Sequence, residues 1–206
     1  MADSTSRLIA KQTVGWPILV VAFATCVYFL PNFSTALVYD RSAIISGELW
    51  RLITCHWVHF STSHLFYDVV VLSVTGWIIK SQNYRYLTTL CLLASVSISL
   101  MIYILLPDMA RYGGLSGIAM ASTVYLSLHC LRELPPWRWA GLLIFLLCIG
   151  KLVFEASVSS FALLDFESDL VVPAYLSHHV GVICGIVMYL WSSVNRPRLF
   201  LKPEKS

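Results

Sequence analysis

The chain has 206 residues, of which 58% are hydrophobic and only 12% are charged, and its formal net charge is +3. A soluble domain carries about 25% charged residues, so this composition excludes an ordinary soluble globular protein. The apolar residues also form runs close to the roughly 20 residues that a bilayer-spanning helix needs. The sequence therefore predicts an all-α, polytopic membrane protein organised as one compact domain.

Six apolar segments are expected to form the membrane-spanning helices. They cover residues 14–30, 64–79, 86–106, 115–131, 139–154 and 174–194. Residues 1–13 are a short polar leader, and residues 195–206 are a basic tail. No small-x-small cleavage motif follows the first segment, so we interpret it as a retained helix and not as a signal peptide. The stretch 31–63 is aromatic and mostly uncharged, which predicts ordered structure at the membrane surface.

Lysine and arginine are distributed unevenly between the two sides of this six-helix bundle. Both termini fall on one side, where we count ten basic residues against three on the opposite side. The ten are Arg7, Lys11, Lys80, Arg85, Arg132, Arg138, Arg196, Arg198, Lys202 and Lys205, and the three are Arg41, Arg51 and Arg111. Because short loops rich in Lys and Arg remain in the cytoplasm, both termini are expected to be cytoplasmic.

Polar and ionisable side chains at membrane depth are costly to bury and are therefore functional candidates. They form three groups, at the starts of the second, fourth and sixth predicted helices. These are His56, His59, His64 and Asp68; then Ser116; then His178 and His179. With cytoplasmic termini, all three helices begin on the external side, so the three groups are expected to meet in one cavity near that surface.

Ser116 is the candidate nucleophile. It lies in the string Gly-Gly-Leu-Ser-Gly at residues 113–117. A catalytic serine needs a nearby base and hydrogen-bond donors for the developing oxyanion. Flanking glycines let the backbone approach a substrate and expose amide groups at a helix start. The alternative is a serine that only packs, because this helix is rich in small residues and such helices lie inside bundles.

His64 and Asp68 are four residues apart and therefore share one helix face. Both are able to donate a hydrogen bond to an oxyanion, Asp68 only when it is protonated, a state that burial favours. In the alternative reading, Asp68 accepts a hydrogen bond from His64 or another helix and only stabilises the bundle. A zinc site that adds His56 and His59 is a further reading, but the spacings match no familiar metal motif. We therefore expect no metal.

The spacing of small residues selects the base from two adjacent histidines. Gly181 and Gly185 follow His178 on one helix face, which forms a smooth groove for another helix. The fourth helix has its own small pair, Gly117 and Ala121, and close approach of the two faces brings His178 toward the serine. His179 instead lies on a face of larger apolar side chains that suits lipid or packing. That face comprises Val182, Ile183 and Ile186.

Three motifs resemble those of the rhomboid intramembrane proteases. They are His59-x4-His64-x3-Asp68, Gly114-x-Ser116-Gly117 and His178-x2-Gly181-x3-Gly185, in that order and on the expected helices. Trp50-Arg51 is similar to the Trp-Arg signature of the family, and the resemblance covers about residues 47–190. General rhomboids usually carry Asn in place of Asp68. The chain resembles the rhombosortase branch more closely, through Asp68 and through the strings at 47–54 and 150–155.

This resemblance implies a catalytic dyad, because no third carboxylate is needed to orient the base. Ser116 would be the nucleophile, and His178 would be the general base and acid. His64, Asp68 and the Ser116 amide would form the oxyanion site. His59 and Gly114 would belong to the same oxyanion and substrate-binding group. Trp50, Arg51, Gly181 and Gly185 would be structural, and no organic cofactor is implied.

The rhombosortase resemblance also implies a location and a class of substrate. The chain would be a multi-pass protein of the bacterial inner membrane, with its active site open to the periplasmic side. Its partners would be membrane lipid and exported proteins that end in a Gly-Gly motif, a transmembrane helix and a basic tail. No nucleic acid is expected, and the sequence makes no prediction of oligomeric state.

Three alternatives to this function remain open. They are a generic rhomboid protease that cleaves other transmembrane segments, an inactive rhomboid-like scaffold that binds helices, and a small transporter. Opposed charges at mid-membrane would favour the transporter. Only Lys151 and Glu155 come near this pattern, and their spacing indicates a local ion pair.

Overall fold

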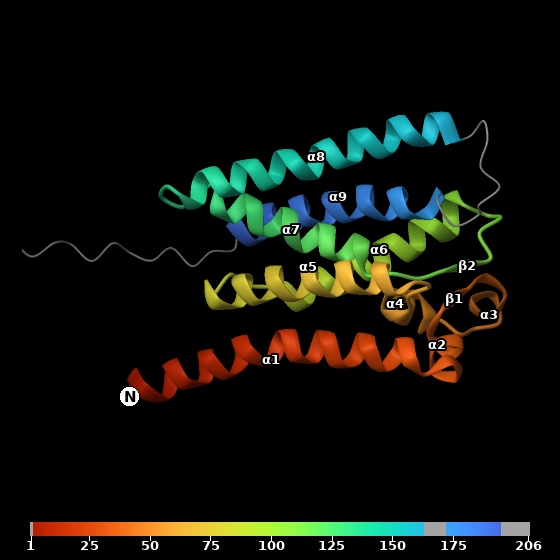
Figure 1. Ribbon diagram of the computed structural model, residues 1–206, viewed down its shortest axis with the longest axis horizontal. Helices are drawn as coiled ribbons and strands as arrows, with labels where there is room; N and C mark the ends of the chain where they lie inside the picture. Colours follow the sequence, from red (N-terminus) through yellow and green to blue (C-terminus); the bar gives the residue numbers. More distant parts are fainter. Residues whose placement is uncertain (1, 163–171, 195–206) are drawn as a thin grey trace, which may run out of the picture.

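The computed structural model describes residues 2–162 and 172–194, and its long helices run side by side (Figure 1). The long helices are α1 (Ala2–Phe29), α5 (Thr62–Ser81), α6 (Leu87–Leu105), α7 (Ser116–Cys130), α8 (Trp137–Ala162) and α9 (Val172–Val194). Each overlaps one predicted apolar segment. The helical class is therefore confirmed, and the basic tail 195–206 lies outside the described residues.

Several of these helices are long and apolar enough to cross a bilayer, which makes the chain an integral membrane protein. Within the described residues, α5, α6, α8 and α9 meet this condition alone. The stretch Gly15–Phe29 of α1 meets it together with α2 (Pro31–Leu37), from which it is bent by 105°. Helix α7 has 15 residues, fewer than the roughly 17 that a span requires. Six full spans are therefore not established.

Helix α7 lies in the middle of the bundle, as its small residues predict. Nearly all of its side chains are buried. Ser122 on α7 shares a hydrogen bond of 2.8 Å with Thr75 on α5. On the other side of α5, a Cβ added at Gly76 would lie 1.9 Å from the indole nitrogen of Trp16, so this glycine lets α1 pack closely. Small residues therefore determine how the helices approach one another.

The segment between α1 and α5 is ordered, as expected from its composition. It contains α2, β1 (Tyr39–Asp40), α3 (Arg41–Ile45), α4 (Arg51–Thr54) and the short 3-10 helix η1 (Cys55–Trp57). Strand β1 pairs antiparallel with β2 (Arg111–Tyr112), which places Tyr39 opposite Tyr112. Because β2 leads into α7, this pairing connects the first loop to the start of the buried helix.

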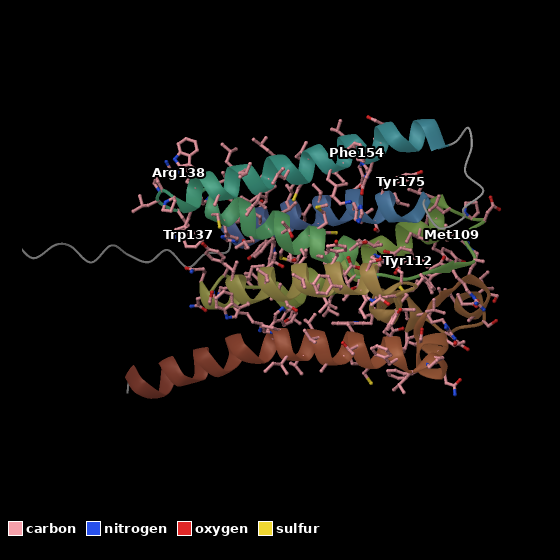
Figure 2. All side chains as sticks on the ribbon, viewed as in Figure 1. Met109, Tyr112, Trp137, Arg138, Phe154 and Tyr175 are labelled. Carbon is pink, nitrogen blue, oxygen red and sulfur yellow. The ribbon has the colours of Figure 1, made fainter. Side chains whose placement is uncertain are left out.

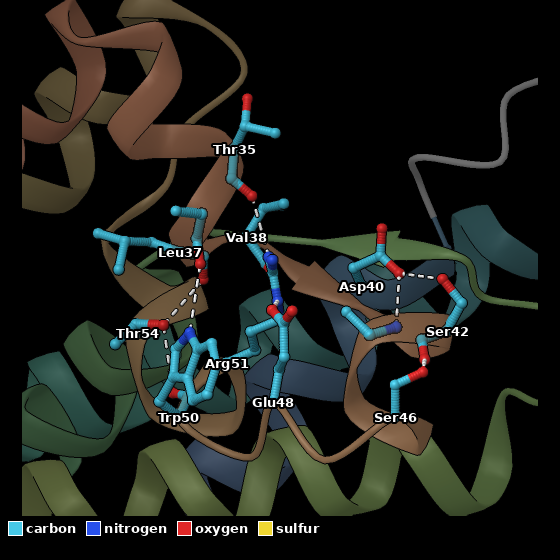
Figure 3. Close-up of polar contacts among 12 residues, drawn as sticks. Thr35, Leu37, Val38, Asp40, Ser42, Ser46, Glu48, Trp50, Arg51 and Thr54 are labelled. Carbon is cyan, nitrogen blue, oxygen red and sulfur yellow. Dashed lines mark hydrogen bonds and ion pairs between the residues drawn. The ribbon is translucent and has the colours of Figure 1, made fainter.

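Trp50 and Arg51 form hydrogen bonds within this first loop (Figure 3). The Arg51 guanidinium donates to the carbonyl oxygens of Thr35 and Val38 at 2.9 and 2.8 Å. It also pairs with Glu48 at 2.6 Å. The Trp50 indole N–H donates to a carbonyl of α2 at 3.3 Å. These bonds satisfy backbone oxygens that the short helices leave without partners.

Both chain ends of the described helices lie at the same end of the bundle. In Figure 1, α1 starts and α9 finishes at the left, and Figure 2 places Trp137 and Arg138 there too. Tyr112 and Tyr175 lie nearer the opposite end (Figure 2). The sequence predicts that both chain ends of the six-helix bundle lie on one side, and the described helices have this arrangement.

Two helices extend well beyond their predicted segments, by eight residues or more at one end. Helix α1 begins at Ala2 and so includes the polar leader, which contains no Gly or Pro to interrupt it. Helix α8 continues to Ala162, eight residues beyond the expected end at 154. Glu155 therefore lies inside a helix, with a defined side-chain direction.

Candidate active site

Ser116 is the first residue of α7 and is only partly buried, whereas Leu115 and Gly117 on either side are buried. The start of a helix leaves the amide groups of its first turn without intrahelical acceptors. These amides give the site fixed donors beside the Ser116 hydroxyl. The hydroxyl and a set of potential oxyanion donors therefore lie at the same point of the chain.

Gly114 brings this loop against the polar residues of α5. Its φ of +137° belongs to a region that side chains other than glycine rarely adopt. A Cβ at this position would lie 2.7 Å from Cε1 of His64 and 3.8 Å from Oδ2 of Asp68. The backbone two residues before Ser116 therefore packs against His64 and Asp68, the predicted oxyanion pair. The structure thus brings the polar group of α5 close to the loop that carries Ser116.

Asp68 contacts two imidazoles through one carboxylate oxygen. Its Oδ2 lies 3.2 Å from Nε2 of His59 and 3.1 Å from Nε2 of His64. The side chains of His59 and Asp68 are buried, whereas that of His64 is 35% exposed. His64 is thus the member of this cluster that is most accessible to a substrate. The buried Asp68 carboxylate contacts its Nε2. In the described ranges, no three His, Cys, Asp or Glu side chains are grouped as metal ligands.

His56 contacts the loop before Ser116 and also α6. Its Nδ1 lies 3.3 Å from the carbonyl oxygen of Gly114. Its Nε2 lies 2.9 Å from the carbonyl oxygen of Ser95 and 3.1 Å from Oγ of Ser99, both on α6. Complete burial lowers the pKa of His56. The sequence grouped His56 with the reactive residues, and the structure shows that it connects the loop before Ser116 to α6.

Helices α7 and α9 are in backbone contact along the predicted glycine face. A Cβ added at Gly181 would lie 2.2 Å from the carbonyl oxygen of Gly117. A Cβ added at Gly185 would lie 2.7 Å from the carbonyl oxygen of Ala121. No side chain fits in either position. The close approach that the small-residue spacing predicts is therefore confirmed.

The same contact brings the chain around the two candidate catalytic residues together. A Cβ added at Gly117, next to Ser116, would lie 2.8 Å from the carbonyl oxygen of Ser177, next to His178. His178 is 6% exposed and lies in the first turns of α9. The start of α7 and the start of α9 thus meet at this point of the bundle.

The two adjacent histidines have different environments. Nδ1 of His179 donates to the carbonyl oxygen of Tyr175 on its own helix at 2.7 Å. Nδ1 of His178 lies 2.9 and 2.8 Å from the two carboxylate oxygens of Glu155 on α8. The predicted ion pair of Glu155 with Lys151 is also present. The contact between Glu155 and His178 is a feature that the sequence reasoning missed.

Together these residues provide the components of acyl transfer. A partly exposed hydroxyl lies at the start of α7, an imidazole lies near the start of the facing helix α9, and a second imidazole, that of His64, lies against Gly114 in the loop before the hydroxyl. Such a set is able to form and hydrolyse an ester intermediate.

Comparison with known families agrees with this arrangement. The family model for the Rhomboid domain matches residues 46–194, which is more than half of the chain. None of the curated proteins compared with the chain matches it significantly. The matched range includes the three groups of polar residues and excludes α1. Rhomboid proteins are intramembrane serine proteases that act on membrane-anchored proteins. The chain belongs to the rhomboid family.

Proposed function

We propose that this protein is an intramembrane serine endopeptidase in which Ser116 is the nucleophile and His178 is the general base and acid. The observation that carries the proposal is the backbone contact between α7 and α9. Gly117 and Gly181 meet there without side chains, one residue after Ser116 and three residues after His178. This contact supports an arrangement in which the imidazole reaches the hydroxyl.

The reaction follows the general scheme of serine peptidases. Nε2 of His178 takes the proton of the Ser116 hydroxyl while Oγ bonds to the carbonyl carbon of the scissile peptide. The protonated imidazole then gives this proton to the leaving amine, and the C–N bond breaks. Water repeats the sequence on the acyl-enzyme, which releases the second product and regenerates both side chains. The partial exposure of Ser116 supports access for water.

His64 and the Ser116 amide are the proposed donors to the oxyanion of the tetrahedral intermediate. His64 is the exposed member of its cluster and lies against Gly114. In this proposal Asp68 is an acceptor that orients His64 and His59, because one of its oxygens lies within 3.2 Å of both imidazoles. Donors placed in advance toward developing charge account for a large part of catalysis in such sites.

The proposed substrates are exported bacterial proteins that end in a Gly-Gly motif, a transmembrane helix and a basic tail. The support is the resemblance of Asp68 and of the strings at 47–54 and 150–155 to the rhombosortase branch. The proposed location is the bacterial inner membrane, with the site open to the periplasm. A generic rhomboid would cleave other transmembrane segments, and an inactive scaffold would bind them intact.

Co-expression with a precursor that carries this C-terminal signal tests the proposal. The protein should remove the anchor, and Ser116→Ala should leave the precursor intact while the variant still accumulates in the membrane. Replacement of the Gly-Gly pair should protect the precursor. Equal cleavage of the Gly-Gly-replaced precursor would identify a generic rhomboid. Cleavage by Ser116→Ala would contradict the serine mechanism, and binding without cleavage by the unmodified protein would identify a scaffold.

A further inference from the structure

The side chain of Glu155 reaches across from α8 to the proposed base on α9. Nδ1 of His178 lies 2.8 Å from one carboxylate oxygen and 2.9 Å from the other. The Glu155 side chain is 19% exposed and that of His178 is 8% exposed, so the contact is shielded from bulk solvent. A carboxylate is an acceptor only, and a close partner for it at Nδ1 is an N–H group. The contact therefore places a proton on Nδ1 of His178.

The protonation of Nδ1 decides what the other ring nitrogen does. A neutral imidazole carries one N–H and one lone pair. With the N–H turned to Glu155, the lone pair is on Nε2, the nitrogen that the proposed mechanism assigns to the Ser116 proton. When Nε2 takes that proton, the imidazole becomes a cation beside a carboxylate, which stabilises it.

Lys151 completes this arrangement one helical turn before Glu155. Its Nζ pairs with Oε1 of Glu155 and lies 3.4 Å from Nδ1 of His178. Since Lys151 and a protonated Nδ1 are both donors, they share the carboxylate and do not bond to each other. An unpaired carboxylate at membrane depth is costly, and Lys151 offsets this cost. The lysine also weakens the field of Glu155 at the imidazole.

We propose that Glu155 is a positioning residue that fixes the tautomer and orientation of His178 and stabilises its protonated form, with Lys151 moderating that effect. The proposal rests on the proposed pairing of Ser116 with His178 and extends it to a third residue. Among the described residues, the charged groups that act on His178 are Glu155 and Lys151 from α8 and Asp68 from α5. Only the first two contact the ring at Nδ1.

The test measures how fast a fluorescent fluorophosphonate labels the purified, detergent-solubilised protein at different pH values. In this reaction Oγ of Ser116 bonds to phosphorus, fluoride leaves, and the hydroxyl proton passes to His178. Glu155→Gln keeps the shape of the side chain and removes its charge. We expect at least about a tenfold loss of the labelling rate. The acid limb of the pH–rate profile should move about one pH unit lower, because the neighbouring anion no longer favours the protonated ring.

Two further variants separate positioning from a purely structural role. Lys151→Gln leaves the carboxylate and removes its countercharge, so the acid limb should move to higher pH, opposite to its direction in Glu155→Gln. Glu155→Asp retains the charge and should recover part of the lost rate. Glu133→Gln is the matched control, since Glu133 accepts a hydrogen bond of 2.8 Å from the Tyr84 hydroxyl beyond the far end of α7. It should label as the unmodified protein does.

The outcomes distinguish this proposal from the proposed function. If Ser116→Ala still labels, the assignment of the nucleophile fails. If Ser116→Ala does not label and Glu155→Gln keeps the rate and the pH profile of the unmodified protein, the role of Glu155 is overturned. If Glu155→Gln melts well below the unmodified protein, the pH–rate profile of Lys151→Gln is the deciding measurement. An acid limb at higher pH than in the unmodified protein supports the proposal. An acid limb at the same pH overturns it.

Discussion

At the scale of single residues, each imidazole of the site lies beside a defined acceptor. Asp68 holds His59 and His64, the carbonyl oxygen of Tyr175 holds His179, and Glu155 holds His178. The acceptor at one ring nitrogen determines which tautomer is present and which nitrogen remains available. In both His178 and His179 the acceptor lies at Nδ1, so Nε2 is the available nitrogen of each ring. The two residues differ because His178 has a carboxylate at Nδ1 and shares its helix face with Gly181, which packs against α7, whereas His179 has only a backbone carbonyl of its own helix.

Replacing each histidine by alanine should show this difference. His178→Ala removes the proposed base, and activity should fall by about 10²–10⁴-fold, the usual contribution of general-base catalysis. His179→Ala loses one hydrogen bond to Tyr175, which costs about 0.5–1.5 kcal/mol of stability, and should retain most activity. Rates of substrate cleavage and melting temperatures of the two variants check this. An inactive His179→Ala beside an active His178→Ala would move the base by one residue.

The residues of the site could be predicted from the sequence where the chain carries a local pattern. The spacing of Gly181 and Gly185 distinguishes His178 from His179, and the structure shows the resulting contact with α7. Glu155 lies in the string 150–155 that resembles the rhombosortase branch, but no spacing in the sequence connects it to His178. Lys151, four residues before it, provides a sufficient local partner, and only the packing of α8 against α9 brings the carboxylate to His178. A charged pair at membrane depth is a signal of function, but it does not identify His178 as the partner of the carboxylate.

At the scale of elements, the contact between α7 and α9 depends on residues without side chains. Gly181→Leu would place a branched side chain where a Cβ already lies 2.2 Å from the Gly117 carbonyl oxygen. Such overpacking typically costs about 1–3 kcal/mol and here would separate the two helices. We expect a lower melting temperature together with an activity as low as that of His178→Ala.

A substitution on another face of the same helix provides the control. Ile183 is 59% exposed, so Ile183→Leu changes shape without meeting a neighbouring backbone. It should leave both the melting temperature and the activity nearly unchanged. If Gly181→Leu is as stable and as active as Ile183→Leu, the α7–α9 contact does not hold the site together.

The helices themselves follow from hydropathy because apolar runs must span the bilayer. The predicted segment 86–106 becomes α6 at Leu87–Leu105, and 115–131 becomes α7 at Ser116–Cys130. The first loop shows the limit of this reasoning. Its order was expected, but the bonds of Arg51 to the carbonyl oxygens of Thr35 and Val38 join residues 13 to 16 apart. Such contacts follow from the tertiary fold and leave no periodic pattern in the sequence.

At the scale of the whole molecule, the bundle has two chemically different ends. The starts of α5, α7 and α9 carry the polar residues of the site, and the start of α1 and the end of α9 lie at the other end (Figure 1). The ten-to-three distribution of basic residues favours the cytoplasm for the second end. A reporter fused after Ser206 should therefore be active only in the cytoplasm. A reporter active only in the periplasm would invert the bundle and turn the site toward the cytoplasm.

The central claim is that Ser116 is a nucleophile activated by His178 across the α7–α9 contact. Labelling of the solubilised protein with a fluorophosphonate, followed by mass spectrometry of the labelled peptide, tests it most directly. The label should be found on Ser116, should be absent in Ser116→Ala, and should form about 10²-fold or more slowly in His178→Ala. A label on another residue, or an equal labelling rate in His178→Ala, would contradict the claim.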